Sequence, residues 1–227
     1  MTLRLGVLVS GSGSNLQSII DAIHSDRLDA EIKVVISNVP EVRALDRAER
    51  AGIKALCVDH REFDRREEFD ERLRRLLVEH DVEWVVLAGF MRILTSRMLE
   101  KFKNRVLNIH PALLPAFPGT DAARQAIERG VTIAGCTIHI VDAGTDTGPI
   151  LAQAAVPVFP EDDSATLTAR IQEQEHWLYP RLLQCISEGR LRLQNERPVL
   201  VGLPPASGMI RSPNIPENEV HGEEAPT

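Results

Sequence analysis

The sequence predicts an α/β protein built on an open, mostly parallel, twisted sheet, with helices on both faces and an antiparallel addition in the C-terminal half. Three observations support this class. Short β-rich runs alternate with amphipathic helical patterns up to about residue 110. The first of these runs is almost wholly apolar, as are parallel strands that are buried on both faces. After residue 110, two longer β-rich runs are joined by a glycine-rich stretch, which is typical of an antiparallel pair.

The first half of the chain contains five predicted strands, at 3–10, 32–37, 54–58, 84–88 and 106–109. Helices are predicted between them where apolar residues recur every three or four positions, at 16–23, 42–48 and 69–77. This repeated order of strand and helix favours parallel strands joined by crossover helices.

The second half begins with a proline-rich loop and a helix at about 121–129. The strands 132–141 and 150–158 follow, and then a long helix at about 164–188 with Ser164 as its expected N-cap. We expect residues 1–202 to form a single domain. Residues 203–227 combine prolines with acidic residues and are expected to form a disordered tail.

Composition excludes several classes of protein. The net charge of −7 argues against a partner that is a nucleic acid, because such binding depends on clustered Lys and Arg. No apolar run approaches the roughly 20 residues that span a bilayer, so no membrane partner is expected. The three cysteines Cys57, Cys136 and Cys185 are far apart, which argues against a disulfide framework and favours the reducing cytoplasm.

A glycine-rich turn follows the first strand, with the sequence SGSGSN at 10–15. Glycines allow a tight turn there, and free amides at the start of a helix favour an anion. The third glycine of a dinucleotide fingerprint is replaced by Leu16, and the second strand ends in Ser37 and Asn38 without an acid for a ribose. One phosphate is therefore favoured over a pyrophosphate, and a plain strand-to-helix turn remains the alternative.

Two polar residues, Asn108 and His110, point to the same side at the end of the fifth strand, while Ile109 points to the other side. An amide donor beside an imidazole can polarise a carbonyl and stabilise an oxyanion. An ordinary polar strand end is the alternative.

A glycine-rich loop at 142–149 contributes Asp142 and Asp146, which could belong to a turn or, with more oxygen ligands, to a calcium site. In the strand before it, Thr137 and His139 face away from the better core face and toward the polar groups. A structural role for His139 is equally open. Cys136 would need a base and exposure to act as a nucleophile.

Five segments together resemble the phosphoribosylglycinamide formyltransferases, folate-dependent enzymes of purine synthesis with a Rossmann-like formyltransferase fold. These segments are SGSGSNLQ (10–17), LAGFMRIL (87–94), NIHPALLPAFPG (108–119), DAGTDTGP (142–149) and QEHWLYP (174–180). The resemblance covers about residues 3–201. It implies transfer of the formyl group of 10-formyltetrahydrofolate, as co-substrate and without a metal, to the amine of glycinamide ribonucleotide. It also implies a cytoplasmic enzyme that is a monomer or a homodimer.

The resemblance also implies site residues. Asn108, His110 and Asp146 would be catalytic, and Thr137 and His139 would support them. Residues 1–107 would form the nucleotide-binding half, and residues 108–202 would contribute mainly to the folate and catalytic half. The ribonucleotide would be bound by Gly13, Ser14, Asn15 and Glu175. The folate would be bound by Arg66, Met91, Arg92, Ile93, Leu94 and Asn108, and by the loop residues Asp142, Ala143, Gly144, Thr145 and Asp146.

In the implied mechanism the amine attacks the formyl carbonyl while both substrates lie side by side, so no covalent enzyme intermediate is needed. Asn108 and His110 would donate to the formyl oxygen. Asp146 beside His110 would favour the imidazolium, and a water between them could relay protons.

Four alternatives can be weighed. A formyltetrahydrofolate hydrolase shares the same core, but that family has a second histidine where Pro111 follows His110 here. A methionyl-tRNA formyltransferase would carry a basic RNA-binding domain, whereas the C-terminal segment here is acidic. A non-catalytic nucleotide sensor would bind no folate, and a Rossmann oxidoreductase would bind NAD(P).

Overall fold

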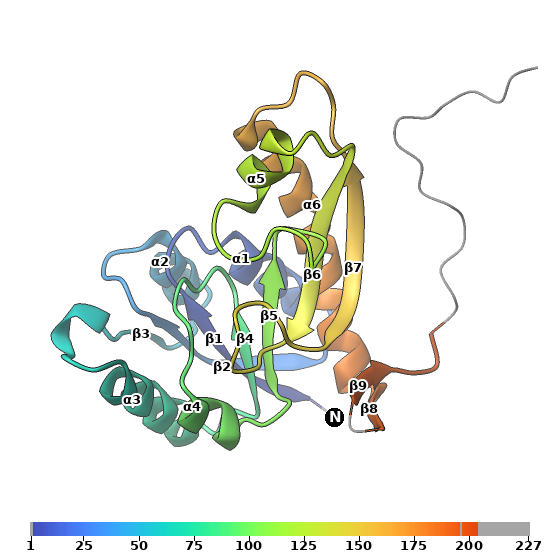
Figure 1. The fold of residues 1–227 in the computed structure, drawn as a ribbon. Helices are drawn as coiled ribbons and strands as arrows, with labels where there is room; N and C mark the ends of the chain where they lie inside the picture. Colours follow the sequence, from blue (N-terminus) through green and yellow to red (C-terminus); the bar gives the residue numbers. More distant parts are fainter. Residues whose placement is uncertain (1, 196, 204–227) are drawn as a thin grey trace, which may run out of the picture.

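The computed structural model describes residues 2–195 and 197–203, and within them it confirms the predicted class of fold (Figure 1). The main sheet has seven strands, in the spatial order β3 (Ala55–Cys57), β2 (Ala30–Ser37), β1 (Leu3–Val9), β4 (Trp84–Leu87), β5 (Val106–His110), β6 (Ile133–Ile140) and β7 (Ile150–Pro157). Neighbouring strands from β3 to β5 are parallel. β6 is antiparallel to both β5 and β7, which is the predicted antiparallel addition.

Helices cover both faces of the sheet. One face is covered by α1 (Ser14–His24), α2 (Arg43–Arg50), α5 (Ala122–Glu128) and α6 (Ser164–Ser187), and the other by α3 (Arg66–Glu79) and α4 (Ser96–Lys101). Alternate residues of a strand supply the two core layers. Val7 packs in the layer under α1 and α6, and the next residue, Leu8, packs in the layer under α3 and α4. Leu16, which occupies the position of the third glycine in a dinucleotide-binding fingerprint, is fully buried in the first layer.

The structure differs from the sequence-based expectations at short or terminal features. The N-cap of α6 is Asp163 and not Ser164, since the Asp163 carboxylate accepts from the Thr166 amide and the Thr166 hydroxyl accepts from the Asp163 amide. This reciprocal pair satisfies the backbone N–H groups of Thr166 and Asp163, which Ser164 as N-cap would not do. The turn η1 (His60–Glu62), the helix α4 and the hairpin β8 (Leu191–Gln194) and β9 (Arg197–Leu200) were not predicted, because each is too short for a periodic pattern. The expected tail lies outside the described residues apart from exposed Leu203.

The strand order changes direction between β1 and β4, and their carboxyl ends diverge into a crevice there. Tyr179 of α6 is fully buried beneath it, with its hydroxyl 3.2 Å from the carbonyl oxygen of Leu87 and 3.1 Å from that of Leu107. This side chain ties α6 to β4 and β5. The long helix is therefore fixed against the strand ends that carry the candidate site.

Candidate active site

The glycine-rich turn brings backbone close to the neighbouring helix. Gly13, the N-cap of α1, has a φ of 70°, and a Cβ atom there would lie 2.7 Å from the Cβ of Ala44. Only glycine adopts this left-handed conformation readily and leaves this space. The Ala44 amide donates to the carbonyl of Gly11 at 3.1 Å, so α2 holds the turn from one side. The first amides at the start of a helix have no acceptor within the helix, so those of α1 suit an anion.

A cleft of about 380 Å³ opens beside this turn. It is lined by the turn itself, the segment after β4, the residues flanking His110, and one face of α6: Ser10, Gly11, Ser12, Gly13, Ser14, Asn15, Ala88, Gly89, Met91, Ile109, Pro111, Thr168, Gln172 and Glu175. The expected ribonucleotide residues Gly13, Ser14, Asn15 and Glu175 are therefore brought together in one cleft.

Glu175 is 5% exposed and lies on α6, where its Oε2 accepts a hydrogen bond of 2.7 Å from the side-chain Nδ2 of Asn15. Burial raises the pKa of the Glu175 carboxyl, and the Asn15 hydrogen bond opposes that rise. The Oδ1 atom of Asn15 is buried without a hydrogen-bond partner. These two side chains therefore place an acceptor and a titratable carboxyl at the cleft wall.

Asp146 lies at the centre of the second group of predicted residues. Its Oδ2 is 3.3 Å from Nδ1 of His110 and accepts from the Gly119 amide at 2.9 Å. Its Oδ1 is 3.4 Å from Nδ2 of Asn108 and 3.6 Å from Nε2 of His139. The contacts to the three side chains are long for hydrogen bonds, whereas the Gly119 contact has ordinary length. The carboxylate is thus positioned by backbone and only loosely bonded to the side chains around it.

The pKa of Asp146 reflects opposing influences. Burial, the largest influence, favours the protonated carboxyl. The hydrogen bonds from His139 and the Gly119 amide and the charges of His110 and His139 outweigh it, so the pKa is lowered from its ordinary value. Asp146 is therefore an anion at neutral pH.

Both ring nitrogens of His110 already have acceptors. Nε2 lies 2.7 Å from the carbonyl oxygen of Phe117, and Nδ1 faces Asp146 directly. His110 and Asp146 are close enough for direct contact, and the relay water that the resemblance implied stays a prediction. Nδ2 of Asn108 points to His139 at 3.1 Å as well as to Asp146. The predicted donors lie on one side of β5 as expected, but each is engaged within the protein.

The strand β6 places Thr137 opposite His110 and His139 opposite Asn108. The buried Thr137 hydroxyl donates to the Ala112 carbonyl at 2.6 Å and accepts from the Leu114 amide at 2.9 Å, which fixes the segment after His110. Cys136 faces the apolar core and is fully buried, and burial raises its pKa to about 12. A nucleophilic role for Cys136 is therefore disfavoured.

Of the expected folate residues, Met91 lines this cleft and the others lie outside its described lining, with varied exposure. Met91 is 72% exposed and Ile93 is 47% exposed, whereas Leu94 is buried. The guanidinium of Arg92 lies over the ring of Phe69, and its Nε is buried without a partner. Arg66 begins α3, and its charge lowers the pKa of buried Asp70, although burial raises that pKa more.

The loop of 142–149 holds its shape through its own contacts. The Asp142 carboxylate accepts from the Gly144 amide at 3.1 Å and the Thr147 hydroxyl at 2.8 Å. A Cβ on Gly148 would lie 1.8 Å from the carbonyl oxygen of Ile140, so glycine is required there. Ala143 and Thr145 make no side-chain contact that defines a role. Within the described ranges, no group of three or more His, Cys, Asp or Glu side chains could hold a metal ion, and the expectation of a metal-free site stays a prediction.

The sequence predicted no hydrogen-bonding role for Ser10, although it lies in the predicted turn, and none for Gln153. The Ser10 hydroxyl donates to Asn38 at 2.6 Å and accepts from the Met91 amide at 2.8 Å, so it joins β1, β2 and the segment after β4. Gln153 of β7 donates to the Thr137 hydroxyl and the Leu114 carbonyl, both at 2.9 Å. A lone glutamine within an otherwise apolar strand was the only signal available for it.

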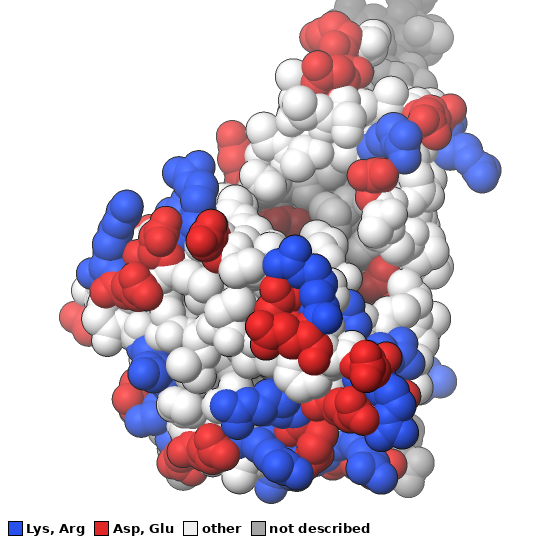
Figure 2. All heavy atoms as spheres, turned by 90° about the vertical axis from the view of Figure 1, so that its left-hand side faces the viewer, with Lys and Arg blue, Asp and Glu red and all other residues white. Residues whose placement is uncertain are grey.

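Figure 2 views the molecule from the left-hand side of Figure 1 and shows a hollow with few charges below the upper part of the molecule. Charges of both signs are mixed over the lower part, and no broad basic surface faces the viewer. This face offers no electrostatic platform for a nucleic acid. None of the helices in the described part of the chain is long and apolar enough to cross a membrane.

Comparison with known proteins agrees with the geometry. Residues 3–183 match the family described as formyl transferase. The chain is 41% identical to the phosphoribosylglycinamide formyltransferase of Escherichia coli, with 89% of this chain and 97% of that protein covered. A solved structure, glycinamide ribonucleotide transformylase 1 from Symbiobacterium toebii, matches with a TM-score of 0.85 and 47% identity, over 88% of this chain and 94% of that one.

Longer relatives match over the same region. The chain is 49% identical to the trifunctional purine biosynthetic protein adenosine-3 of Drosophila pseudoobscura pseudoobscura, over 85% of this chain. It spans only 14% of that protein. It is 45% identical to the human trifunctional purine biosynthetic protein adenosine-3, over 84% of this chain and 19% of that protein.

Proposed function

This chain belongs to the formyl transferase family, and on that premise we propose that it is a phosphoribosylglycinamide formyltransferase. It transfers the formyl group of 10-formyltetrahydrofolate to the amine of glycinamide ribonucleotide, which yields formylglycinamide ribonucleotide and tetrahydrofolate in purine synthesis. The observation that carries the proposal is the meeting of Asn108, His110 and Asp146 next to Ile109 and Pro111, which line a cleft that also reaches the start of α1.

The two ends of the site suit the two ends of the ribonucleotide. The backbone of Gly13, Ser14 and Asn15 binds its phosphate, because free amides at a helix start favour an anion. Glu175 contacts the remainder of the substrate from α6. The amine then lies toward Ile109 and Pro111, the neighbours of His110 in the cleft lining. Holding both reactants in this way can contribute several kcal/mol.

Charge develops on the formyl oxygen during attack, so donors must be available there. The Asn108 contact to Asp146, at 3.4 Å, is the weakest hydrogen bond of its amide group and the one that a formyl oxygen can replace. Contacts of this kind often tighten only when substrate is bound. Asp146 accepts a proton from the attacking amine as its nitrogen bonds to the formyl carbon, and the direct contact with His110 gives that proton a path to the folate nitrogen, which is protonated as its bond to the formyl carbon breaks. Thr137 and His139 hold these groups in place.

The second substrate supplies the formyl group, and the residues around the crevice fit it. Exposed Met91 and Ile93 offer apolar surface to its rings. Buried Leu94 and the loop of Asp142, Ala143, Gly144 and Thr145 complete the proposed folate site. Arg66 and Arg92 offer charge to its carboxylates, and the buried, unpartnered Nε of Arg92 is a donor in need of an acceptor. We further infer a cytoplasmic monomer or homodimer in which residues 1–202 form one domain.

The test is release of tetrahydrofolate from 10-formyltetrahydrofolate, followed by absorbance with glycinamide ribonucleotide present or withheld. We expect release only when the ribonucleotide is present. Comparable rates in both conditions would contradict transfer and favour a hydrolase. The Asn108→Ala variant serves as the inactive control.

A further inference from the structure

We propose that Arg47, which does not line the substrate cleft, supplies the positive charge that the phosphate-binding turn lacks and holds that turn in its binding conformation. The inference rests on the proposed function, since that function places a phosphate ester at Gly13–Asn15. It makes Arg47 a positioning residue for the ribonucleotide and not for the folate.

The cleft itself is short of positive charge. Among the described residues that line it there is no lysine or arginine, and its one charged side chain is the carboxylate of Glu175. A phosphate monoester carries about −1.5 to −2 charges at neutral pH. The amides of one helix start would have to bind this charge against Glu175 unless a cation lies behind them.

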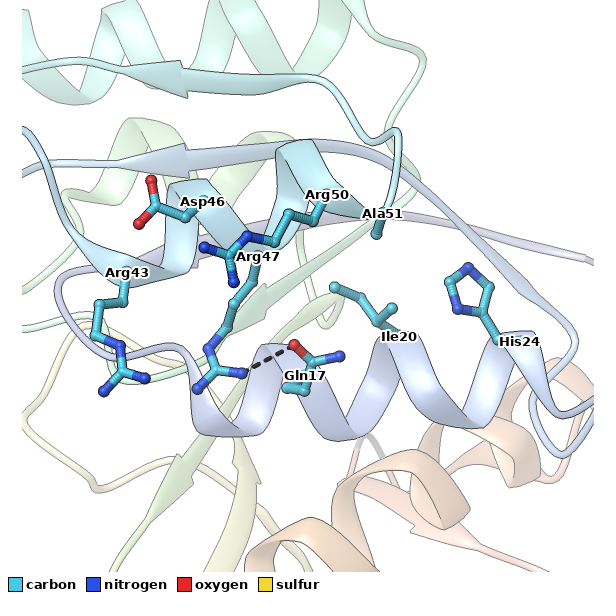
Figure 3. A pocket seen from close by; sticks show the side chains of 8 residues that line it. All are labelled: Gln17, Ile20, His24, Arg43, Asp46, Arg47, Arg50 and Ala51. Carbon is cyan, nitrogen blue, oxygen red and sulfur yellow. Dashed lines mark hydrogen bonds between the residues drawn. The ribbon is translucent and has the colours of Figure 1, made fainter.

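Arg47 lies directly behind the turn. Its Nε donates to the carbonyl oxygen of Ser12 at 2.9 Å, and its terminal nitrogen donates to Oε1 of Gln17 on α1 at 2.9 Å. Figure 3 shows the side chain crossing from α2 to α1 with the Gln17 contact dashed. The carboxylate of Asp46 points away from the Arg47 guanidinium in this view, and Arg47 forms no ion pair within the described chain.

The Ser12 carbonyl and the Gly13 N–H belong to the same peptide group. A guanidinium that donates to the carbonyl polarises that group, so the N–H on its other side becomes a stronger donor to an anion. The charge of Arg47 also influences a side chain on α6. After burial, it is the second influence that lowers the pKa of His176, the residue next to Glu175.

The experiment compares the full chain with R47Q, R47K and two matched variants. R50Q removes a charge from the same helix, and Arg50 and Arg47 line one pocket between α1 and α2 (Figure 3). Among the described residues, Arg50 has no hydrogen bond to the turn. Q17A removes the contact between the helices without removing the Arg47 charge. For each protein the KM of glycinamide ribonucleotide and of 10-formyltetrahydrofolate is measured at ionic strengths from about 0.02 M to about 0.5 M.

We expect R47Q to raise the KM of the ribonucleotide about tenfold or more, as loss of a charge-assisted hydrogen bond does, with kcat and the folate KM within about twofold of wild type. R47K should recover part of the loss, because it keeps the charge but not the planar fork. The ribonucleotide KM of the wild type should rise with salt more steeply than that of R47Q. R50Q and Q17A should resemble the wild type.

A ribonucleotide KM in R47Q that equals that of R50Q would overturn the inference, as would an equal rise in both KM values with a lowered Tm. A second readout needs no turnover: inorganic phosphate should raise the Tm of the wild type more than that of R47Q. If the wild type does not transfer the formyl group at all, the proposed function is wrong. The phosphate titration still decides whether Arg47 strengthens anion binding at this turn.

Discussion

Oδ2 of Asp146 lies 3.3 Å from Nδ1 of His110, although one residue comes from the loop between β6 and β7 and the other from the end of β5. The carboxylate is held there by the Gly119 amide and not by its side-chain neighbours, so it keeps its place while protons move around it. A group that is anchored by backbone and loosely bonded to two histidines and an amide is suited to accept a proton during turnover.

Replacing Asp146 by asparagine tests this role. The amide keeps the size of the carboxylate but cannot accept the proton, so kcat should fall by about 10²–10⁴. Both substrates should still bind with near-normal Kd, measured by fluorescence titration and by competition. Loss of binding in parallel with kcat would indicate a disturbed loop instead of a lost proton acceptor.

Asn108→Ala removes the amide assigned to the formyl oxygen. Because such a donor acts mainly in the transition state, kcat should fall by about 10²–10³ while both KM values change little. His110→Ala should behave similarly. Steady-state kinetics with either substrate varied gives the answer, and near-normal turnover in both variants would remove these residues from the mechanism.

Gly13→Val should raise the KM of the ribonucleotide more than that of the folate. Valine resists the positive φ, and its Cβ would meet Ala44 at 2.7 Å. Gly11→Ala is the matched control in the same turn, since a Cβ there meets no atom within 4 Å and its φ is not positive. If both variants shift the KM equally, the effect does not come from the backbone conformation at Gly13.

Gly148→Ala should displace the loop that carries Asp146, because the added Cβ would lie 1.8 Å from the Ile140 carbonyl oxygen. We expect kcat to fall at least about tenfold, as is common when a catalytic group is misplaced by about 1 Å. Gly130→Ala, where the added Cβ meets nothing within 4 Å, controls for the added methyl group without a clash, although Gly130 has a positive φ and Gly148 does not. Unchanged kcat in Gly148→Ala would show that the loop tolerates the shift.

Glu175→Gln should change stability with a defined pH dependence. Burial raises the folded-state pKa of Glu175 above its ordinary value, so its contribution to stability is present below that value and is lost as pH rises through the folded-state pKa. The variant stays neutral, and its amide can donate to the unpartnered Oδ1 of Asn15. Urea unfolding should therefore show that the variant becomes more stable relative to the wild type as pH rises above the ordinary pKa of a glutamate carboxyl. Exposed Glu173, changed to glutamine, should show no such trend.

Much of the fold could be predicted because the strands are apolar and the helices amphipathic, and both patterns are local. The alternation of Thr137 and Cys136 on β6 correctly separated the polar side from the core side, since a strand has a strict period of two. Short elements such as α4 and the pair β8 and β9 carry no period, so their existence depends on what they pack against.

The sequence by itself determined the strand-and-helix order, the glycine turn after β1, and the polar pair Asn108 and His110 on one side of a strand. Only the tertiary structure decided that Asp146 reaches that pair, that Glu175 of a distant helix bonds Asn15, and that Arg47 lies behind the turn. These contacts join segments far apart in the chain. They follow from strand order and helix packing, which depend on the burial of side chains elsewhere in the protein. A local sequence pattern therefore does not predict them.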